Sequence, residues 1–284
     1  MIYKTEAGKR AILDRYAEAL ESWPVPADRL RVSTREGETF VVASGPPEAP
    51  PLVLCHGSGT NAAMWLDDVA EWAKHLRVHA VDMIGEPGLS APSRPPLGSE
   101  AYALWLDDGL AGLGLARVAI VGASLGGWLA LDYATRRPNQ VERLALLCPG
   151  GLGRQTYGWV VKALLSKPFG RWGMRKSLKA VAGIDAARTP QIAEYVGLIF
   201  THFLPRRDKL PVFGDDALRR LRMPVRVIVG GRDAMFDSAG TVRRVEHAIP
   251  HAHVTVLPDV AHSITGQTGP VLDFLLAETP SDAR

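Results

Sequence analysis

Residues 117–128 read R-V-A-I-V-G-A-S-L-G-G-W, and this stretch decides the fold that the sequence predicts. Val118 to Val121 form a short apolar run without polar alternation, which is typical of a strand buried on both faces of a parallel sheet. Glycines on both sides of Ser124 then complete a G-x-S-x-G pattern, in which a sharp strand-to-helix turn holds a serine in a strained conformation. The pattern predicts a nucleophile elbow, with Ser124 exposed at the strand end and the backbone N–H of Leu125 facing any oxyanion formed there.

Glycine and serine patterns of this length also occur for purely structural reasons, so the rest of the chain must be weighed with it. The chain has 284 residues, of which 46% are hydrophobic and 22% charged, an ordinary composition for a soluble globular protein. That length suits one large α/β domain with an insertion, or two small domains. A net charge of +3 gives no reason to expect nucleic-acid binding.

Several functional classes lack their motifs in this sequence. There is no H-E-x-x-H, no paired-cysteine motif and no P-loop, so we expect neither a metal nor a cofactor. Cys55 and Cys148 do not make a disulfide framework. No apolar run approaches about 18 residues, which argues against a membrane span. The charged first ten residues lack the apolar core of a signal peptide, and we therefore expect a cytoplasmic protein.

Buried strands alternate with helical segments along most of the chain. The pattern predicts an amphipathic helix over residues 6–23 and then a hairpin, whose strands at 29–34 and 38–43 join at Gly37. Apolar runs that indicate buried strands follow at 52–55, 78–81, 118–121, 141–148, 224–229 and 253–257. We therefore predict an α/β fold with an about eight-stranded, mostly parallel sheet flanked by helices.

The strand at 52–55 ends in His56-Gly57-Ser58-Gly59. In this segment the sequence resembles the α/β-hydrolase family, whose oxyanion hole takes one amide from the residue after the nucleophile and another from this loop. The resemblance implies that the amide of Ser58 is the second donor and that Gly57 lies close to the substrate. It implies a bracing role for His56. Trp65 lies near the start of the next helix and is a candidate substrate contact, although a place in the core is the plainer interpretation.

The resemblance also implies the remaining members of a catalytic triad. The stretch 82–90 is similar to the family's D-x-x-G-x-G-x-S, and we interpret Asp82 there as a structural carboxylate that braces the loop. Asp233 follows a buried strand and two glycines, where the family's triad acid is expected; Asp237 is a nearby competitor. His262 follows the last strand and completes the order Ser, Asp, His.

Residues 150–215 interrupt the alternation of strands and helices. Helical stretches broken by glycine and proline indicate a helical cap inserted after strand 6, which leaves 1–149 and 216–284 as the hydrolase core. Trp159 of this segment is a second candidate substrate contact. Eleven lysine and arginine residues face four acids in the segment, an excess of seven positive charges. A solvated helix surface is the plainer interpretation of this excess, and attraction of an acidic or carrier-tethered acyl substrate is the alternative.

Three motifs narrow the resemblance to bacterial carboxylesterases: M-W-x-x-x-V-A-x-W at 64–72, A-V-D-M-I-G at 80–85 and G-A-S-L-G-G-W at 122–128. The resemblance implies an enzyme that cleaves an ester or thioester through Ser124, His262 and Asp233, with a covalent acyl-enzyme. A serine at the elbow argues against haloalkane dehalogenases and ordinary epoxide hydrolases, which use a carboxylate nucleophile.

Other chemistry on the same triad stays open at the level of sequence. Carbon–carbon bond hydrolases, lyases, haloperoxidases without a cofactor, and acyltransferases or cyclases all use these residue types. A ligand-binding protein that keeps the scaffold without catalysis is a further alternative. The expected partner is a small acyl substrate, and the chain itself is expected to be a monomer or a homodimer.

Overall fold

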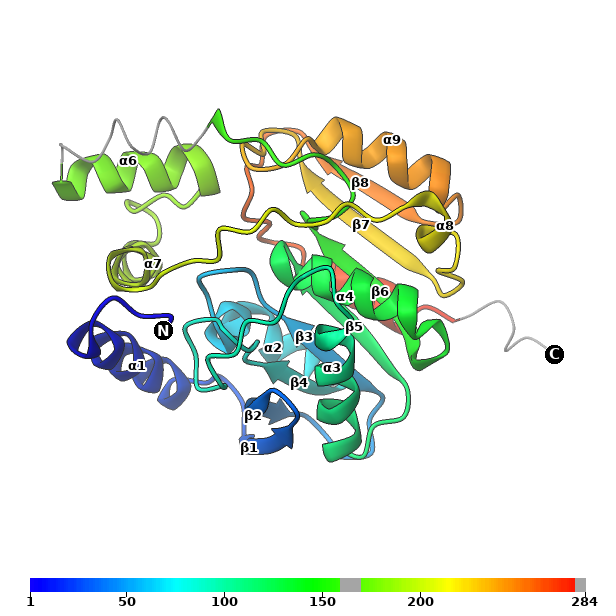
Figure 1. The fold of residues 1–284 in the computed structure, drawn as a ribbon, viewed down its shortest axis with the longest axis horizontal. Helices are drawn as coiled ribbons and strands as arrows, with labels where there is room; N and C mark the ends of the chain where they lie inside the picture. Colours follow the sequence, from blue (N-terminus) through cyan, green and yellow to red (C-terminus); the bar gives the residue numbers. More distant parts are fainter. Residues whose placement is uncertain (159–169, 279–284) are drawn as a thin grey trace.

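A computed structural model describes residues 1–158 and 170–278 of the chain. Its centre is an eight-stranded sheet in the order β1-β2-β4-β3-β5-β6-β7-β8 (Figure 1). The strands are β1 (Ala27–Thr34), β2 (Gly37–Ser44), β3 (Pro51–Cys55), β4 (Arg77–Val81), β5 (Val118–Ala123), β6 (Val141–Leu147), β7 (Val225–Gly230) and β8 (His253–Leu257).

The sheet is mostly parallel, as the sequence predicts. Only β1 with β2 and β2 with β4 run antiparallel, and every other neighbouring pair is parallel. The predicted hairpin is present: its turn lies at Arg35 and Glu36, and Gly37 begins β2 with a φ of 104°, which suits glycine and strains other residues. Strand β5 lies between β3 and β6, so Cys55 and Cys148 come from strands on opposite sides of it, and both thiols are free. The expectation that they form no disulfide is confirmed.

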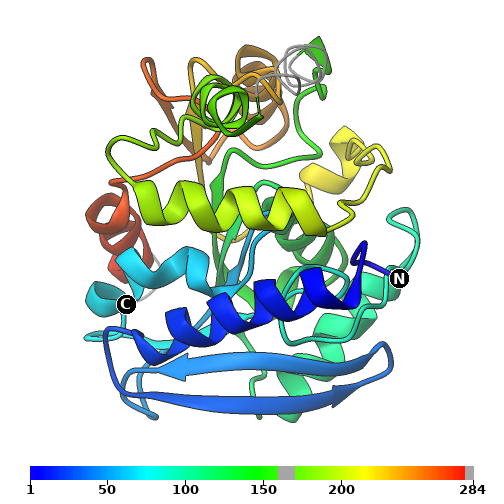
Figure 2. The same cartoon turned by 90° about the vertical axis from the view of Figure 1, so that its left-hand side faces the viewer.

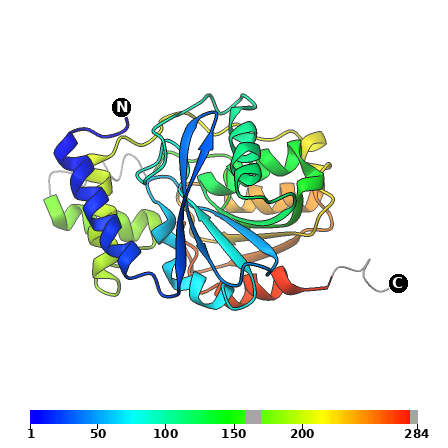
Figure 3. The ribbon, with the colours of Figure 1, turned by 90° about the horizontal axis from the view of Figure 1, so that it is seen from below.

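Helices cover both faces of the sheet. Helices α3, α4 and α9 lie over one face and α2 and α10 over the other (Figure 3). Their buried apolar side chains belong to the two core clusters on these faces. The helices are α1 (Glu6–Glu21), α2 (Leu66–Trp72), α3 (Ala101–Gly112), α4 (Leu125–Arg136), α6 (Gly170–Ala182), α7 (Pro190–His202), α8 (Asp215–Leu218), α9 (Ser238–Ala248) and α10 (Thr268–Leu276), with short 3-10 turns at Ala62–Trp65 and Pro138–Gln140. This three-layer arrangement buries the apolar strands on both faces.

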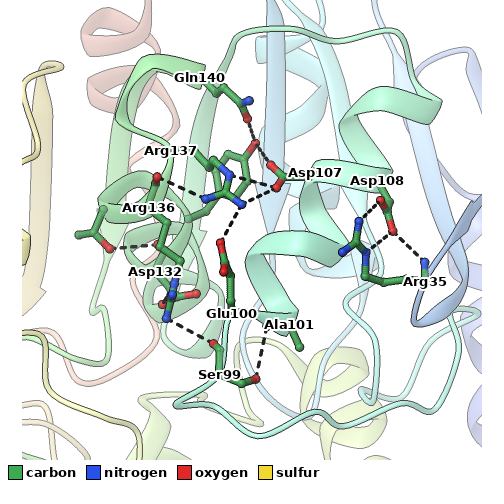
Figure 4. Close-up of polar contacts among 12 residues, drawn as sticks. Arg35, Ser99, Glu100, Ala101, Asp107, Asp108, Asp132, Arg136, Arg137 and Gln140 are labelled. Atoms are coloured by element: carbon green, nitrogen blue, oxygen red, sulfur yellow. Dashed lines mark hydrogen bonds and ion pairs between the residues drawn. The ribbon is translucent and has the colours of Figure 1, made fainter.

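A polar network ties α3 to the end of α4 (Figure 4). Arg137 contacts both Asp107 and Glu100, each at 2.9 Å, and Arg136 pairs with the buried carboxylate of Asp132 at 2.9 Å. The partly exposed pairs of Arg137 stabilise the fold by only about 0–1 kcal/mol each, so the apolar layers remain the main source of stability.

The segment between β6 and β7 contains α6, α7 and α8 and, in its described part, no strand of the sheet. The insertion after the sixth strand is therefore helical there, whereas the exact division into 1–149 with 216–284 and 150–215 stays a prediction. The N-terminal segment packs on this insertion: α1 lies beside α7 (Figure 2). Five buried side chains form the cluster between them: Ile2, Tyr3, Ile12, Ile199 and Phe203.

Candidate active site

The predicted nucleophile lies in the turn between β5 and α4. Ser124 has φ 53° and ψ −109°, a backbone conformation that non-glycine residues rarely adopt and that clusters at functional sites. Close packing explains the flanking glycines. A Cβ on Gly126 would lie 2.1 Å from the carbonyl oxygen of Cys55, and one on Gly122 would lie 2.5 Å from the carbonyl oxygen of Gly126. A side chain at Gly126 would push α4 away from β3, and one at Gly122 would push α4 away from β5.

Loops after three different strands bring Ser124, His262 and Asp233 together. Nε2 of His262 lies 2.9 Å from Oγ of Ser124, and Nδ1 of His262 lies 2.8 Å from Oδ2 of Asp233. The side chain of Asp233 is 1% exposed and that of His262 is 11% exposed. The three groups therefore form a continuous, nearly dry hydrogen-bonded chain with the geometry of a nucleophile, a base and an orienting acid.

The carboxylate of Asp233 is fixed by its own loop. Its Oδ1 accepts the backbone N–H groups of Met235 at 2.7 Å and Phe236 at 3.1 Å, which leaves Oδ2 for His262. The nearby Asp237 has a structural role, since its side chain accepts the amide of Gly240 and caps α9. Of the two aspartates, only Asp233 contacts the imidazole.

The sequence did not indicate that Cys148 lies beside the histidine. Its Sγ donates to the carbonyl oxygen of His262 at 2.8 Å and lies 3.9 Å from Nε2 of the same residue. Burial lowers the pKa of His262, but the Cys148 sulfur and the Asp233 carboxylate both favour the imidazolium and raise it; the net direction is upward. The ring of Phe236 packs against the imidazole, with 5.3 Å between ring centroids.

The loop after β3 approaches the serine. A Cβ built on Gly57 would lie 3.7 Å from Cβ of Ser124. The carbonyl oxygen of Gly57 is held by Nδ1 of His56 at 2.8 Å and by the hydroxyl of Thr60 at 2.7 Å. Because a trans peptide points its N–H opposite to its C=O, the N–H of Ser58 faces away from these two groups.

Two backbone N–H groups are available near the serine. The amide of Leu125 belongs to the first residue of α4, where a helix has no internal partner for its N–H. Among residues 1–158 and 170–278, neither this amide nor that of Ser58 donates a hydrogen bond. Both amides are thus free to donate to a bound oxygen.

The two bracing side chains that the resemblance implies have structural contacts. Nε2 of His56 accepts the amide of Met83 at 2.9 Å, so the proton of its imidazole lies on Nδ1, and burial lowers its pKa to about 4. Asp82 accepts the amides of Ala62 and Leu89, at 2.8 and 2.7 Å, and the hydroxyl of Tyr16. Neither side chain contacts the serine.

The structure corrects the prediction that Trp65 contacts substrate. Its side chain is 1% exposed and packs on Trp72 in the core between α2 and the sheet, with 5.9 Å between ring centroids. The apolar face of this helix, which directs the ring inward, outweighs its closeness in sequence to the oxyanion loop. Trp159 lies outside the described residues.

One group of side chains in the described chain has the donor types of a metal site. Ligand atoms of Cys148, Asp233 and His262 all lie within 4.8 Å of one another. Both nitrogens of the imidazole, however, already have partners in Asp233 and Ser124. The donor set therefore fits hydrogen-bonded proton transfer better than metal ligation.

Fold and site together define a hydrolase of the nucleophile-elbow type. Residues 52–273 match the alpha/beta hydrolase family, and the chain belongs to that family. No helix in the parts of the chain that the structure describes has both the length and the apolar character needed to cross a bilayer.

Carboxylesterases of Bacillus subtilis are among the proteins to which the chain is similar. The chain is 30% identical to an uncharacterized carboxylesterase, nap, over 88% of this chain and 85% of the relative. The crystal structure of carboxylesterase CesB (YbfK) superposes with a TM-score of 0.82 at 27% identity, covering 96% of this chain and all of the other. That of naproxen esterase (carboxylesterase NP) gives 0.80 at 28% identity, covering 95% and 94%.

Proposed function

We propose that this protein is a serine hydrolase that cleaves carboxylic esters, or thioesters, with small to medium acyl groups. The observation that carries the proposal is the hydrogen-bonded chain from Ser124 through His262 to Asp233. The similarity of the polypeptide to proteins named carboxylesterases, over most of the length of each, supports an ester as the substrate.

Acylation begins when Nε2 of His262 takes the hydroxyl proton of Ser124 and Oγ attacks the carbonyl carbon of the ester. The carbonyl oxygen becomes an oxyanion, which the amides of Ser58 and Leu125 stabilise by donating hydrogen bonds. When the tetrahedral intermediate collapses, the bond to the leaving alcohol breaks and the alcohol takes the proton from His262. The acyl group then remains on Ser124.

Deacylation repeats the sequence with water as the nucleophile. His262 takes a proton from the water, the hydroxide oxygen attacks the acyl carbon, and Ser124 regains the proton as it leaves. Throughout, Asp233 accepts the Nδ1–H of His262, which fixes the tautomer and stabilises the imidazolium. The amides that hold Asp233 keep its second oxygen in place.

Hydrolysis of p-nitrophenyl acetate, butyrate and octanoate by wild type and Ser124→Ala tests this proposal. Loss of the nucleophile is expected to lower kcat by on the order of 10⁶, and intact-mass analysis is expected to find an acyl adduct on Ser124 of the wild type. Ser99→Ala is the matched control because the Ser99 hydroxyl donates to the carbonyl oxygen of Pro96 and accepts the amide of Ala101, and neither residue belongs to the triad or the oxyanion loop. Activity retained by Ser124→Ala would exclude the mechanism.

Alternative reactions on the same triad would separate in the same experiment. An acyltransferase or cyclase would form the acyl adduct but release it faster to an added amine or alcohol than to water. A carbon–carbon bond hydrolase or a lyase would leave the simple esters uncleaved while Ser124 still reacts with a fluorophosphonate. A non-catalytic binding protein would bind its ligand and return it unchanged.

A preference for acidic or carrier-tethered substrates is a finer prediction, motivated by the positive charge of the cap. Two of the four acids already counted in that charge form pairs within the segment: Asp185 with Lys179 at 2.7 Å and Asp208 with Arg206 at 3.0 Å. Comparing kcat/KM for a dicarboxylate monoester and a neutral ester of equal length, at low and high salt, tests the preference. Sedimentation would distinguish a monomer from a homodimer; all three triad side chains come from one subunit.

A further inference from the structure

A buried carboxylate that the proposed mechanism does not use lies directly behind the oxyanion loop. Glu86, in the loop after β4, is 3% exposed. Its Oε2 accepts the backbone N–H of Gly59 at 2.6 Å and the hydroxyl of Ser58 at 3.2 Å. One carboxylate oxygen thus holds two consecutive residues of the loop after β3.

A second contact ties the same two loops together. Nδ2 of Asn61 donates to the carbonyl oxygen of Pro87 at 2.9 Å, next to Glu86. Gly59 has φ 69°, a left-handed conformation. Its own backbone N–H, in the peptide that joins it to Ser58, is the group that Glu86 accepts. The loop that carries the Ser58 N–H is therefore held from one side by the carbonyl clamp on Gly57 and from the other by Glu86.

The charges around Glu86 explain how an acid is tolerated there. Burial raises the pKa of Glu86 to about 7, while the Gly59 amide and the guanidinium of Arg94 oppose that shift. Arg206 also lowers the pKa of Glu86. Tyr3 and Tyr102 lie close enough for the Glu86 charge to raise their own pKa values. A charged-acceptor hydrogen bond to a backbone N–H is stronger than a neutral one, which suits a residue that must hold a loop still.

We propose that Glu86 is the positioning residue of the oxyanion hole: by holding the Ser58–Gly59 segment, it aims the Ser58 amide at the oxygen of the reacting ester. The inference rests on the proposed function, because it assigns a role within that same site. Glu86 does not touch the reacting atoms in this assignment. It acts through the backbone of the loop, so its loss should weaken the transition state more than substrate binding.

Three substitutions of Glu86 separate its possible roles. Glu86→Ala removes the acceptor, and Glu86→Met removes it while filling a similar volume, which serves if the alanine variant does not fold. Both are expected to lower kcat by about 10²-fold with KM nearly unchanged, since one oxyanion donor is worth about 10²–10³ in kcat. Glu86→Gln keeps an oxygen that can accept the Gly59 N–H and is expected to stay within about 10-fold of wild type.

Asp132→Ala is the matched control. Asp132 is also a buried carboxylate, 3% exposed, but its ion pair with Arg136 lies in the polar network of α3 and α4 (Figure 4). Its loss is expected to lower the melting temperature and leave kcat per folded molecule unchanged. Positioning, rather than general stability, is supported if Glu86→Ala loses more kcat than Asp132→Ala does and if Glu86→Gln retains kcat.

Matched oxygen and thiono esters of butyrate give a readout that a merely structural role would not move. Sulfur accepts hydrogen bonds weakly, so a working oxyanion hole favours the oxygen ester. The oxygen-to-thiono ratio of kcat/KM is expected to fall by about 10-fold or more in Glu86→Ala or Glu86→Met and to hold in Glu86→Gln. An unchanged ratio, or wild-type kcat in the variants without an acceptor, would overturn the proposal.

The same set of proteins distinguishes failure of this inference from failure of the proposed function. Covalent labelling of wild-type Ser124 by a fluorophosphonate, seen by intact mass, reports the nucleophile without any ester turnover. No labelling, or ester hydrolysis that survives Ser124→Ala, would remove the proposed function and this inference with it. If the wild type is labelled and active, and Glu86→Ala keeps the wild-type kcat and oxygen-to-thiono ratio, the inference alone would be removed.

Discussion

The thiol of Cys148 lies between the end of β6 and the loop that carries His262. It donates to the carbonyl oxygen of His262 and lies near the ring nitrogen that would take the serine proton. Cys148 itself has φ 39°, an uncommon conformation for a residue with a side chain. At the residue scale, these contacts make the loop and the protonation of His262 depend on Cys148.

The pH profile should report this dependence. Only neutral His262 can accept the serine proton, so kcat/KM is expected to rise with pH through the pKa of His262. The Cys148 sulfur raises that pKa, and Cys148→Ser, which keeps a donor for the carbonyl oxygen but lacks the sulfur, should move the acidic limb to lower pH. Measuring kcat/KM from pH 5 to 10 checks this. Superimposable profiles would mean that Cys148 has no electrostatic role.

Residues with a defined place in chain order were predictable from the sequence, and residues that act through the fold were not. Ser124, Asp233 and His262 each follow a recognisable strand, and the structure brings them together. Cys148 also follows a strand, but its contact with His262 depends on how two loops meet across β7. Glu86 escaped notice for the same reason, since nothing in its local pattern indicates the loop it holds.

At the scale of elements, the turn between β5 and α4 is packed too tightly for a side chain at Gly126. Gly126→Ala is expected to destabilise the fold by about 1–3 kcal/mol, or more, because the clash is with the backbone of β3 rather than with a movable side chain. Activity should fall with it, since Ser124 sits in this turn. Thermal unfolding and esterase assays measure the two effects.

Gly109 in α3 provides the opposite case. A Cβ there would meet no atom within 4 Å, and alanine is the better helix former by about 1 kcal/mol. Gly109→Ala is therefore expected to raise the melting temperature by roughly 2–4 °C with unchanged activity. Equal effects of the two substitutions would show that packing at the elbow does not distinguish them.

Elements with strong apolar runs were predicted nearly as they occur. The six parallel-type strands and the hairpin follow directly from their buried runs and turn glycine. The packing of α1 on α7 could not be predicted, because it joins two amphipathic helices far apart in sequence whose apolar faces have several possible partners. The burial of Trp65 against Trp72, by contrast, agrees with the core position that the helical spacing favours.

At the scale of the whole molecule, Glu86 makes stability depend on pH in the direction opposite to most carboxylates. Its pKa rises from 4.5 to about 7 on folding, so the folded state binds more protons than the unfolded state between these values. This contribution to stability is fully present below about pH 4.5 and is lost as pH rises through 7. Neutral Glu86→Gln lacks the effect.

From pH 5 to pH 8, the unfolding free energy of the wild type should therefore fall relative to that of Glu86→Gln. We expect a change of about 1–3 kcal/mol, since each pKa unit corresponds to about 1.4 kcal/mol. Urea unfolding of both proteins at the two pH values measures it. A constant difference would mean that Glu86 titrates alike in the folded and unfolded states.

The contact between α1 and α7 also has a consequence for how the protein is made. A ribosome completes α1 long before it reaches α7, because the two helices are separated by most of the sheet. Ile12, which is fully buried in the finished molecule, has no access to Ile199 or Phe203 during that interval. Late pairings of this kind slow folding and leave apolar surface uncovered meanwhile. The apolar face of α1 therefore stays without this partner until the residues of α7 have been synthesised.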